Sequence, residues 1–343
     1  MKSSQLNSLK RNNTFAIDAT CSEILTPNSI DDLMSMPEIK DSQFYILGEG
    51  SNTLFTEQLA PTIISPQFKG IEVNETPTDF IVTVGASENW HYLVTFCIEH
   101  NMFGLENLAL IPGSVGAAPI QNIGAYGSEF SDFCLEIHWF DFKAREQKKI
   151  DNSSCQFGYR ESIFKNKLYN KGLVTHVVLK LEKQWQANLT YSGLDRLPKD
   201  VSAREVMEKV ILLRQSKLPD PKILPNAGSF FKNPIVEKSQ LSHLKTTYPN
   251  IPYYPHAGEQ IKLAAGWLIE QCGLKGYRTN NVGVHNKQAL VLINFKNGTG
   301  KNVVELAFYI QKCVFDKFAI LLEPEVKMVT SKGEIKFEEL KQQ

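Results

Sequence analysis

The chain has 343 residues, 42% of them apolar and 22% charged, so it is long enough to bury a full core and to divide into two or three domains. Lysine plus arginine and aspartate plus glutamate both number 37, which excludes the basic excess of a nucleic-acid-binding protein and the acidic bias of a disordered chain. The polar residues 1–14 and the lack of any membrane-length apolar stretch favour a cytoplasmic protein without a membrane partner.

The first predicted elements form a small α/β unit. A short helix near Ile30–Met36 is followed by a strand at Phe44–Leu47, which ends at the turn Gly48-Glu49-Gly50-Ser51-Asn52. Such a turn is typical of a phosphate-binding loop, but it lacks the third glycine and the opening helix of a Rossmann fingerprint. An ordinary connection between a strand and a turn is therefore the open alternative.

The middle of the chain, from about residue 66 to 184, is predicted to be α+β. Alternation of apolar and polar residues predicts strands at Phe80–Val84, His138–Phe142 and Leu173–Leu181. Small residues and two prolines dominate the segment Asn107–Gly127 within this region. Its bare backbone N–H groups would suit close approach to the pyrophosphate of a flavin or another nucleotide. A tight buried loop that only needs positive φ explains the same composition.

Helical signals resume after residue 200. Ser202 and Glu205 form a predicted capping box, which starts a helix that runs to Lys217 and marks a domain boundary near residues 205–220. Further helices are predicted around Leu263–Cys272 and from Val303 to Phe318.

Three further motifs carry candidate chemistry. In Tyr159-Arg160-Glu161-Ser162, the guanidinium fork matches a carboxylate, although an exposed ion pair with the neighbouring glutamate is the commoner arrangement. Gly228–Pro234 (Gly-Ser-Phe-Phe-Lys-Asn-Pro) combines a hydroxyl, two aromatic rings and two polar anchors, where a turn with core aromatics is the alternative. Glu323-Pro324-Glu325 places two carboxylates near the negative end of a predicted helix, where the dipole does not stabilise them; surface charge is the alternative.

No metal site is predicted. The six cysteines form no C-x-x-C pair, so we expect reduced and mostly buried thiols. The seven histidines are isolated, without H-E-x-x-H spacing. The absence of G-x-S-x-G also argues against the usual hydrolases.

Together these segments resemble the UDP-N-acetylenolpyruvoylglucosamine reductase family over nearly the whole chain. The most specific parts of the resemblance are Leu110–Gly127, Tyr159–Ser162, Gly228–Pro234 and Glu323–Val326. Other matching parts are Asn13–Phe15 as the opening strand, Gly48–Leu54 as the first flavin loop, Ala264–Glu270 as a helix of the substrate domain, and Leu189–Ser192 as the tyrosine loop of the longer subtype. One departure is Lys327, where relatives often carry arginine.

The resemblance implies an α+β protein with an FAD-binding fold of the vanillyl-alcohol-oxidase (PCMH) type in two subdomains, followed by a C-terminal α/β substrate-binding domain. The implied boundaries are residues 1–65 and 66–205 for the two subdomains and 206–325 for the substrate-binding domain. The last strand, within about 326–343, is expected to return to the first subdomain.

The implied activity is that of an FAD-dependent NADPH oxidoreductase acting on a CH–CH group. Hydride passes from NADPH to N5 of non-covalently bound FAD and then to the methylene carbon of the enolpyruvyl ether, giving UDP-N-acetylmuramate for peptidoglycan synthesis. By carry-over from the family, Arg160 holds the carboxylate, Ser229 donates the proton, and Glu325 positions or polarises that end of the substrate. These groups suit an addition that leaves negative charge on the carboxylate and the adjacent carbon.

The resemblance also implies two sets of binding residues. FAD is expected at Gly48, Gly50, Ser51, Asn52, Pro112, Gly113, Ser114, Gly116, Ala117, Gln121, Asn122, Gly124, Ala125, Tyr126 and Gly127. The UDP-sugar is expected at Tyr159, Tyr191, Lys217, Asn233, Tyr254, Lys275 and Gln288. A monomer is expected, in which NADPH uses the same cleft as the substrate. Two other functions stay open: a flavin oxidase with covalently held flavin that uses O₂, and a nucleotide-sugar-binding regulator without the chemistry.

Overall fold

The computed structural model describes residues 6–37 and 44–342, and the chain divides into two compact units. The middle unit comprises Ser22–Gly50 and Pro61–Ser216, and the C-terminal unit comprises Met1–Cys21, Ser51–Ala60 and Lys217–Gln343. The division into three domains with the boundaries given above stays a prediction.

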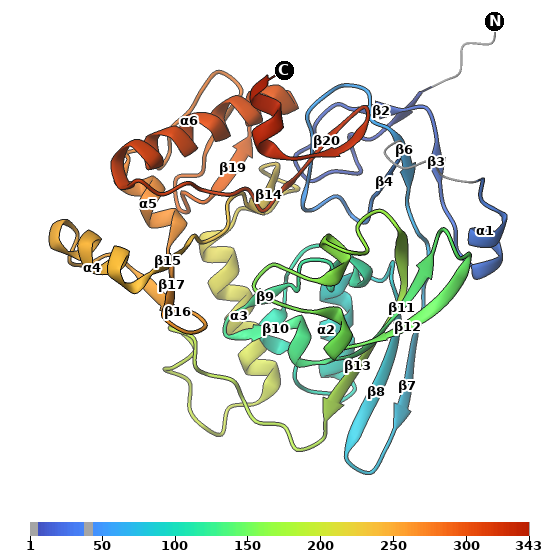
Figure 1. The fold of residues 1–343 in the computed structure, drawn as a ribbon. Coiled ribbons are helices and arrows are strands. Elements are labelled where there is room, and N and C mark those ends of the chain that lie inside the picture. The colour runs from blue at the N-terminus through green and yellow to red at the C-terminus, as the bar shows by residue number, and fades with distance from the viewer. Residues whose placement is uncertain (1–5, 38–43, 343) are drawn as a thin grey trace, which may run out of the picture. The chain divides into compact units, whose positions relative to one another are not determined.

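An antiparallel five-stranded sheet forms the centre of the middle unit, in the order β12-β11-β13-β8-β7 (Figure 1). Its strands are β7 (Ile71–Glu75), β8 (Asp79–Gly85), β11 (Cys134–Asp141), β12 (Glu146–Asp151) and β13 (Gly172–Glu182). The three strands predicted in this region are confirmed. The second starts earlier than expected because Cys134 already pairs with Leu179.

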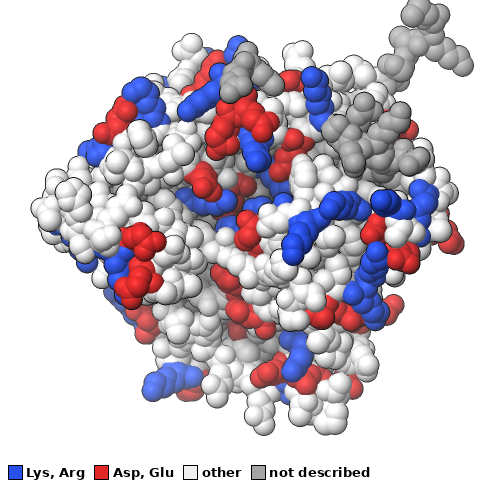
Figure 2. All heavy atoms as spheres, viewed as in Figure 1, with Lys and Arg blue, Asp and Glu red and all other residues white. Residues whose placement is uncertain are grey.

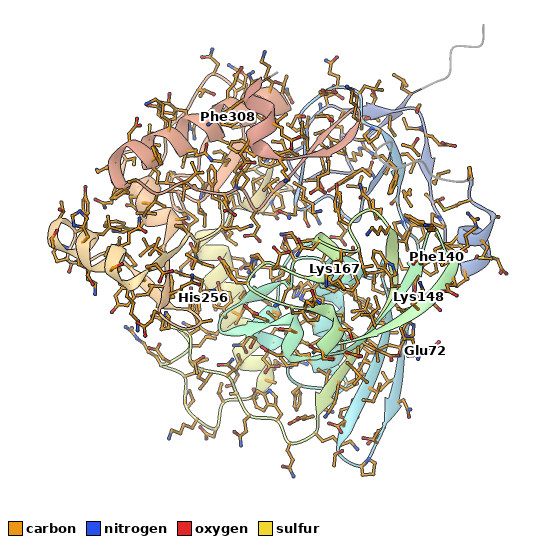
Figure 3. All side chains as sticks on the ribbon, in the orientation of Figure 1. Glu72, Phe140, Lys148, Lys167, His256 and Phe308 are labelled. Carbon is orange, nitrogen blue, oxygen red and sulfur yellow. The ribbon has the colours of Figure 1, made fainter. Side chains whose placement is uncertain are left out.

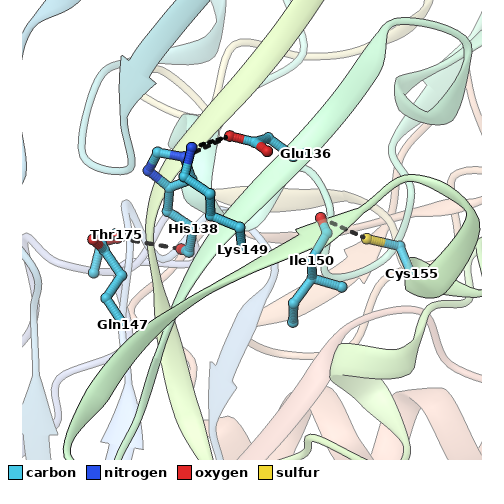
Figure 4. A network of polar contacts seen from close by, with 7 residues as sticks. All are labelled: Glu136, His138, Gln147, Lys149, Ile150, Cys155 and Thr175. Atoms are coloured by element: carbon cyan, nitrogen blue, oxygen red, sulfur yellow. Dashed lines mark hydrogen bonds and ion pairs between the residues drawn. The ribbon is translucent and has the colours of Figure 1, made fainter.

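A polar network ties three of these strands together (Figure 4). Glu136 accepts from Lys149 at 2.9 Å and lies 2.9 Å from the ring nitrogen Nε2 of His138. The amide of Gln147 donates to Thr175 Oγ1 at 2.6 Å, and that hydroxyl donates to the carbonyl of His138 at 3.2 Å. The contacts link β12 to β11 and to β13, and so support the register of the sheet.

Caps fix the helices of the middle unit. The hydroxyl of Ser29 starts α1 (Ile30–Ser35), and the side chain of Asn89 starts α2 (Trp90–Glu99). At α3 (Ala203–Lys217), the Ser202 N–H donates to the Glu205 carboxylate at 2.8 Å and the Glu205 N–H donates to Ser202 Oγ at 3.3 Å, which confirms the predicted capping box. Apolar residues of α2 and α3 join those of the large sheet in one buried core.

The remaining strands of the middle unit are short. A parallel sheet in the order β3-β6-β4 contains β3 (Ile24–Leu25), β6 (Thr62–Ile64) and β4 (Phe44–Ile46). A small hairpin pairs β9 (Gly124–Ala125) with β10 (Ser128–Glu129) at the end of the small-residue segment, residues 107–127.

In its described residues, the C-terminal unit contains small sheets and the helices α4, α5 and α6. Its strands are β1 (Asn7–Ser8), β2 (Thr20–Cys21), β5 (Thr53–Phe55), β14 (Asn226–Ser229), β15 (Ile235–Glu237), β16 (Tyr253–Pro255), β17 (Gln260–Leu263), β18 (Val282–Val284), β19 (Val291–Asn294), β20 (Lys327–Thr330) and β21 (Gly333–Ile335). The strand orders are β14-β19-β18, β15-β17-β16, β21-β20-β5 and β1-β2, with β20 parallel to β5. The helices are α4 (Lys238–Thr247), α5 (Ala265–Gln271) and α6 (Gly300–Phe318).

Two details of the C-terminal unit differ from expectation. The helix predicted to begin at Val303 is α6, which begins at Gly300 because Thr299 and Asn302 form a capping box. Its side chain Phe308, labelled in Figure 3, stacks on Phe337 with ring centroids 4.0 Å apart. The strand expected at Asn13–Phe15 is wrong. The Asn13 amide donates to the carbonyls of Leu9 and Ile17 and so closes a turn there.

Surface charge and thiols agree with the composition. Figure 2 shows acidic and basic side chains interspersed on the face drawn. All six cysteines are free thiols, four of them buried, as predicted for most of them. Among the described residues, no helix is long and apolar enough to cross a membrane, and no cluster of His, Cys, Asp or Glu offers a metal site.

Candidate active site

Ser229 stands at the end of β14, where the strand is irregular. The register with β19 shifts between Asn226 and Ser229, and Gly228 adopts φ 70°, a conformation that favours glycine. Asn226 is 3% exposed; its side chain accepts from the Gly228 N–H at 2.8 Å and donates to the carbonyl of Leu224 at 2.8 Å. These contacts fix the direction of the half-buried Ser229.

Glu325 lies beside Ser229 through backbone contacts. Phe231 forms an antiparallel bridge with Pro324, and the Glu325 N–H donates to the carbonyl of Phe230 at 2.8 Å. On the other side, Asn52 Nδ2 donates to the Glu325 carbonyl at 3.2 Å. The C-terminal unit therefore brings three predicted site residues together: Ser229, Glu325 and Asn52.

The other acidic residue of that motif has a structural role. Glu323 forms an ion pair with Lys232 at 3.2 Å, and its own carboxylate is largely exposed. Because α6 ends at Phe318, both carboxylates lie beyond its last turn, so the expectation that they lie near the negative end of this helix is wrong. Lys327, the departure from the family pattern, pairs with Glu334 at 2.7 Å.

Three of the predicted UDP-sugar residues of the C-terminal unit already have protein partners. Asn233 Oδ1 accepts from the Ala265 N–H at 3.0 Å at the start of α5. Lys275 pairs with Glu270 at 2.9 Å. Gln288 Oε1 accepts from the Leu290 N–H at 3.3 Å. Tyr254 on β16 and Lys217 at the end of α3 are exposed.

The small-residue segment of the middle unit does not present a row of bare N–H donors. The Gly113 N–H donates to Glu49 Oε2 at 3.1 Å, the Gly116 N–H to the Ala86 carbonyl at 2.8 Å, and the Ala117 N–H to the Ser114 carbonyl at 3.0 Å. The expectation that these three N–H groups are bare is therefore wrong, while FAD binding by this segment stays a prediction. Buried N–H groups need partners, and this fold supplies them from the protein.

The glycines of this region allow neighbouring segments of the chain to pack closely together. A Cβ on Gly116 would lie 2.6 Å from the Cβ of Ala86, and one on Gly48 would lie 2.7 Å from Ser114 Oγ. Gly48 and Ser114, from the two predicted FAD loops, are thus in contact within the middle unit. Asn122 is fully buried, and its side chain bonds to Glu129, Gly158 and Ser131. This asparagine orders the loop instead of offering a free amide.

Arg160 is held against the end of the same segment. It adopts φ 56°, and its guanidinium donates to the Gly124 carbonyl at 2.8 Å and lies 5.3 Å from the ring centroid of Tyr159. Glu161, the alternative partner, accepts from the Ser162 N–H at 3.2 Å. An unusual backbone conformation that positions a cation is common at functional sites.

Arg214 is a second cation that the sequence analysis missed. Burial lowers its pKa, the nearby Tyr126 raises it, and the charge of Arg160 lowers it further. Within the described part of the chain, no carboxylate forms an ion pair with Arg214. The signal was present in the helix: Arg214 follows the buried Val210 by four residues and so shares the core-facing side of α3.

Aromatic rings surround these cations in the middle unit. Tyr126 and Tyr191 meet edge to face, with ring centroids 4.9 Å apart. Burial raises the pKa of Tyr126, and the Arg214 charge opposes that shift. The middle unit therefore brings Gly124, Tyr126, Tyr159, Arg160 and Tyr191 of the predicted site into one neighbourhood with Arg214.

Known proteins match the chain over nearly its full length. A family model described as UDP-N-acetylenolpyruvoylglucosamine reductase, C-terminal domain, matches residues 220–329, and a model described as FAD binding domain matches residues 24–143. UDP-N-acetylenolpyruvoylglucosamine reductase from Salmonella typhi is 47% identical over 333 residues, and that from Pseudoalteromonas translucida is 44% identical over 328 residues. Both alignments cover 96% of this chain and 97% of the relative.

A solved structure agrees with the fold. The reductase of the same name from Thermus caldophilus aligns with a TM-score of 0.67 at 23% identity, covering 94% of this chain and 98% of that one. The chain is an α+β protein with an FAD-binding fold of the vanillyl-alcohol-oxidase type, followed by the C-terminal domain of these reductases. It belongs to the UDP-N-acetylenolpyruvoylglucosamine reductase family.

Proposed function

We propose that this chain reduces UDP-N-acetylenolpyruvoylglucosamine to UDP-N-acetylmuramate, with NADPH as the hydride source, in the synthesis of peptidoglycan precursors. The observation that carries the proposal is the placement of Ser229 beside Glu325, fixed by the 2.8 Å hydrogen bond from the Glu325 N–H to the Phe230 carbonyl. Together with family membership, this pair supplies a hydroxyl and a carboxylate for one end of the substrate.

The residues of the middle unit fit an anionic dinucleotide. Arg214 has no ion-pair partner among the described residues, and a half-buried cation of this kind favours a bound anion. Arg214 would supply positive charge to bound FAD, which the Gly48 turn and the small-residue segment would also hold. FAD, when bound without a covalent link, supplies hydride chemistry between NADPH and the substrate.

The protein's own groups handle binding and the proton. Arg160 binds the carboxylate of the enolpyruvyl group and stabilises the negative charge that develops there. Ser229 delivers a proton from Oγ to the substrate carbon. A hydroxyl is a weak acid in water, but a carbanion is a far stronger base, so the transfer is downhill and geometry limits it. Glu325 positions or polarises the same end of the substrate.

The UDP part is assigned to the residues given above for the UDP-sugar, with Tyr191 as a stacking face and Lys217 and Lys275 as cations for the diphosphate. Lys275 forms a partly exposed ion pair with Glu270 at 2.9 Å. Such a pair contributes little stability, about 0–1 kcal/mol, so exchanging the carboxylate for a diphosphate costs little. Occupation of the same cleft by NADPH, a monomeric state and a cytoplasmic location stay predictions.

Anaerobic spectroscopy of the purified protein tests the proposal. The protein should be yellow, acid should release the flavin, NADPH should bleach it, and the enolpyruvyl sugar should restore the colour. The product should carry one hydride and one proton more than the substrate. Stoichiometric peroxide with the flavin retained in the acid pellet would instead indicate an oxidase. Tight binding of the UDP-sugar without turnover would indicate a regulator.

A further inference from the structure

A buried 3-10 turn, η1 (Glu106–Leu108), holds the segment of chain that leads to Tyr191. Glu106 is 2% exposed, and its carboxylate accepts from the indole N–H of Trp185 at 2.6 Å and from the Gly104 N–H at 2.8 Å. Burial raises the pKa of Glu106. The first residue of the segment 185–191, which we call the tyrosine segment, is therefore anchored to this turn.

The next residue of the turn makes the second anchor. Asn107 is 1% exposed, and its Nδ2 donates to the Asn188 carbonyl at 2.9 Å and to the Tyr126 carbonyl at 2.8 Å. Both donors of the amide are in use, and the reversed amide would place Oδ1 against two carbonyl oxygens. One side chain thus joins the tyrosine segment to the end of the small-residue segment.

Asn188 extends the connection toward Tyr191. Its Nδ2 donates to the Gly127 carbonyl at 2.9 Å, and its Oδ1 accepts from the Thr190 hydroxyl at 2.7 Å. A Cβ on Gly127, where φ is 88°, would lie 2.9 Å from Thr190 Oγ1, so a larger residue would separate the two segments. The short turn before Tyr191 is therefore fixed to the residue that follows Tyr126.

We propose that Asn107 is a positioning residue for substrate binding, which sets the place of Tyr191 by tying Asn188 to Tyr126. Asn107 is buried, and it acts through the two backbone carbonyls that its amide joins. Without its amide, a buried carbonyl (Tyr126) and a partly buried one (Asn188) lose this donor, and the tyrosine segment loses its link to the Tyr126 backbone. The inference rests on the proposed role of Tyr191 in binding the UDP part.

The test measures Asn107→Ala in the complete flavoprotein. We expect the KM for UDP-N-acetylenolpyruvoylglucosamine to rise about tenfold, as for the loss of one net hydrogen bond, while the rate of flavin bleaching by NADPH changes less than about twofold. In a Tyr191→Ala background the same change should raise KM by less than about twofold, because the side chain through which it acts is gone.

Asn152→Ala is the matched control. Its amide also bridges two backbone carbonyls of the middle unit, those of Ser131 and Cys134, each at 2.7 Å. It should lower stability in a similar way but leave KM unchanged. If Asn107→Ala does not fold, Asn188→Ala serves instead. It keeps the residue 188 carbonyl that accepts from Asn107 and removes only the side-chain bonds to Gly127 and Thr190. This variant should also raise KM.

Two results would overturn the inference. The first is a wild-type KM in Asn107→Ala or, if that variant does not fold, in Asn188→Ala. The second is an equal rise in KM in the presence and in the absence of the Tyr191 side chain. An equal rise would mean that Asn107 acts through the general fold. A wild-type protein without turnover of the UDP-sugar would overturn the proposed function as well, so the two failures are distinguishable.

Discussion

Replacing Ser229 by alanine should slow the reduction of the substrate by the reduced flavin, which is the second half-reaction, without a structural effect on the protein. The Ser229 backbone pairs with Val291, and the neighbouring Phe230 donates to Leu290 at 2.8 Å and accepts from Glu325. All of these contacts survive in the variant. Among the described residues, none forms a hydrogen bond with Ser229 Oγ, so the change in stability should stay within about 0.5 kcal/mol.

The effect on rate should be much larger and confined to one half-reaction. Bleaching of the flavin by NADPH needs no proton donor to carbon and should proceed at nearly the normal rate. Recovery of the colour with the enolpyruvyl sugar should slow by about 10²–10⁴-fold, the range for loss of a positioned acid. At about 1.36 kcal/mol per tenfold change, this corresponds to about 2.7–5.4 kcal/mol of barrier.

Anaerobic stopped-flow absorbance measures each half-reaction separately. A damaged site would slow both, and Ser229→Cys, which restores a proton donor, should recover part of the rate. Reoxidation of the alanine variant at the wild-type rate would refute the reasoning, and a water or another hydroxyl would then have to donate the proton.

Three further variants test other parts of the structure. Arg214→Leu should weaken FAD retention after ultrafiltration about tenfold or more, and Arg214→Lys should weaken it less. Equal retention of FAD by the wild type and both variants would contradict the proposal that Arg214 binds an anionic part of FAD. Asn294→Ala should lower the free energy of unfolding in urea by about 2–4 kcal/mol, because its buried amide donates to Phe15 at 2.9 Å and accepts from Gly298 at 2.7 Å; a loss below about 1 kcal/mol would be inconsistent with that role. Burial and a neighbouring histidine lower the pKa of His176 below 6.5, so its contribution to stability is present above that pH and is lost as pH falls through the folded-state pKa. His176→Gln should therefore lose less unfolding free energy between pH 7 and pH 5, and an unchanged pH dependence in urea unfolding would argue against this.

Local signals in the sequence were sufficient for the larger strands of the middle unit and for four of the helices. The Ser202 capping box and the alternation in β8 and β13 depend on residues close together in the chain, and the structure has both. The small-residue segment was harder. Its composition indicated a backbone that packs closely, but not that Glu49 and Ala86 accept from its N–H groups. Those partners come from distant parts of the sequence, which periodicity does not reach.

Arg214 is a second case in which the sequence does not show which distant residues lie nearby. Its position on the buried side of α3 follows from helical spacing, yet a cation there has no evident purpose until Tyr126 and Arg160 lie next to it. The sequence therefore contained the anomaly but not its explanation, which requires the tertiary contacts of the middle unit. A charged residue on an otherwise apolar helix face is a better indicator of a site than a charged residue in a loop.

Two hydrogen bonds of its backbone help to fix the place of Glu325. Its N–H is bonded to Phe230 and its carbonyl to Asn52, so the backbone is held from both sides at this residue. Ser229 and Glu325 are 96 positions apart in sequence, yet the Glu325 hydrogen bond to Phe230 and the bridge between Phe231 and Pro324 bring their backbones together. Substitution of either side chain should accordingly change the chemistry while keeping the hydrogen bond from the residue 325 N–H to the Phe230 carbonyl.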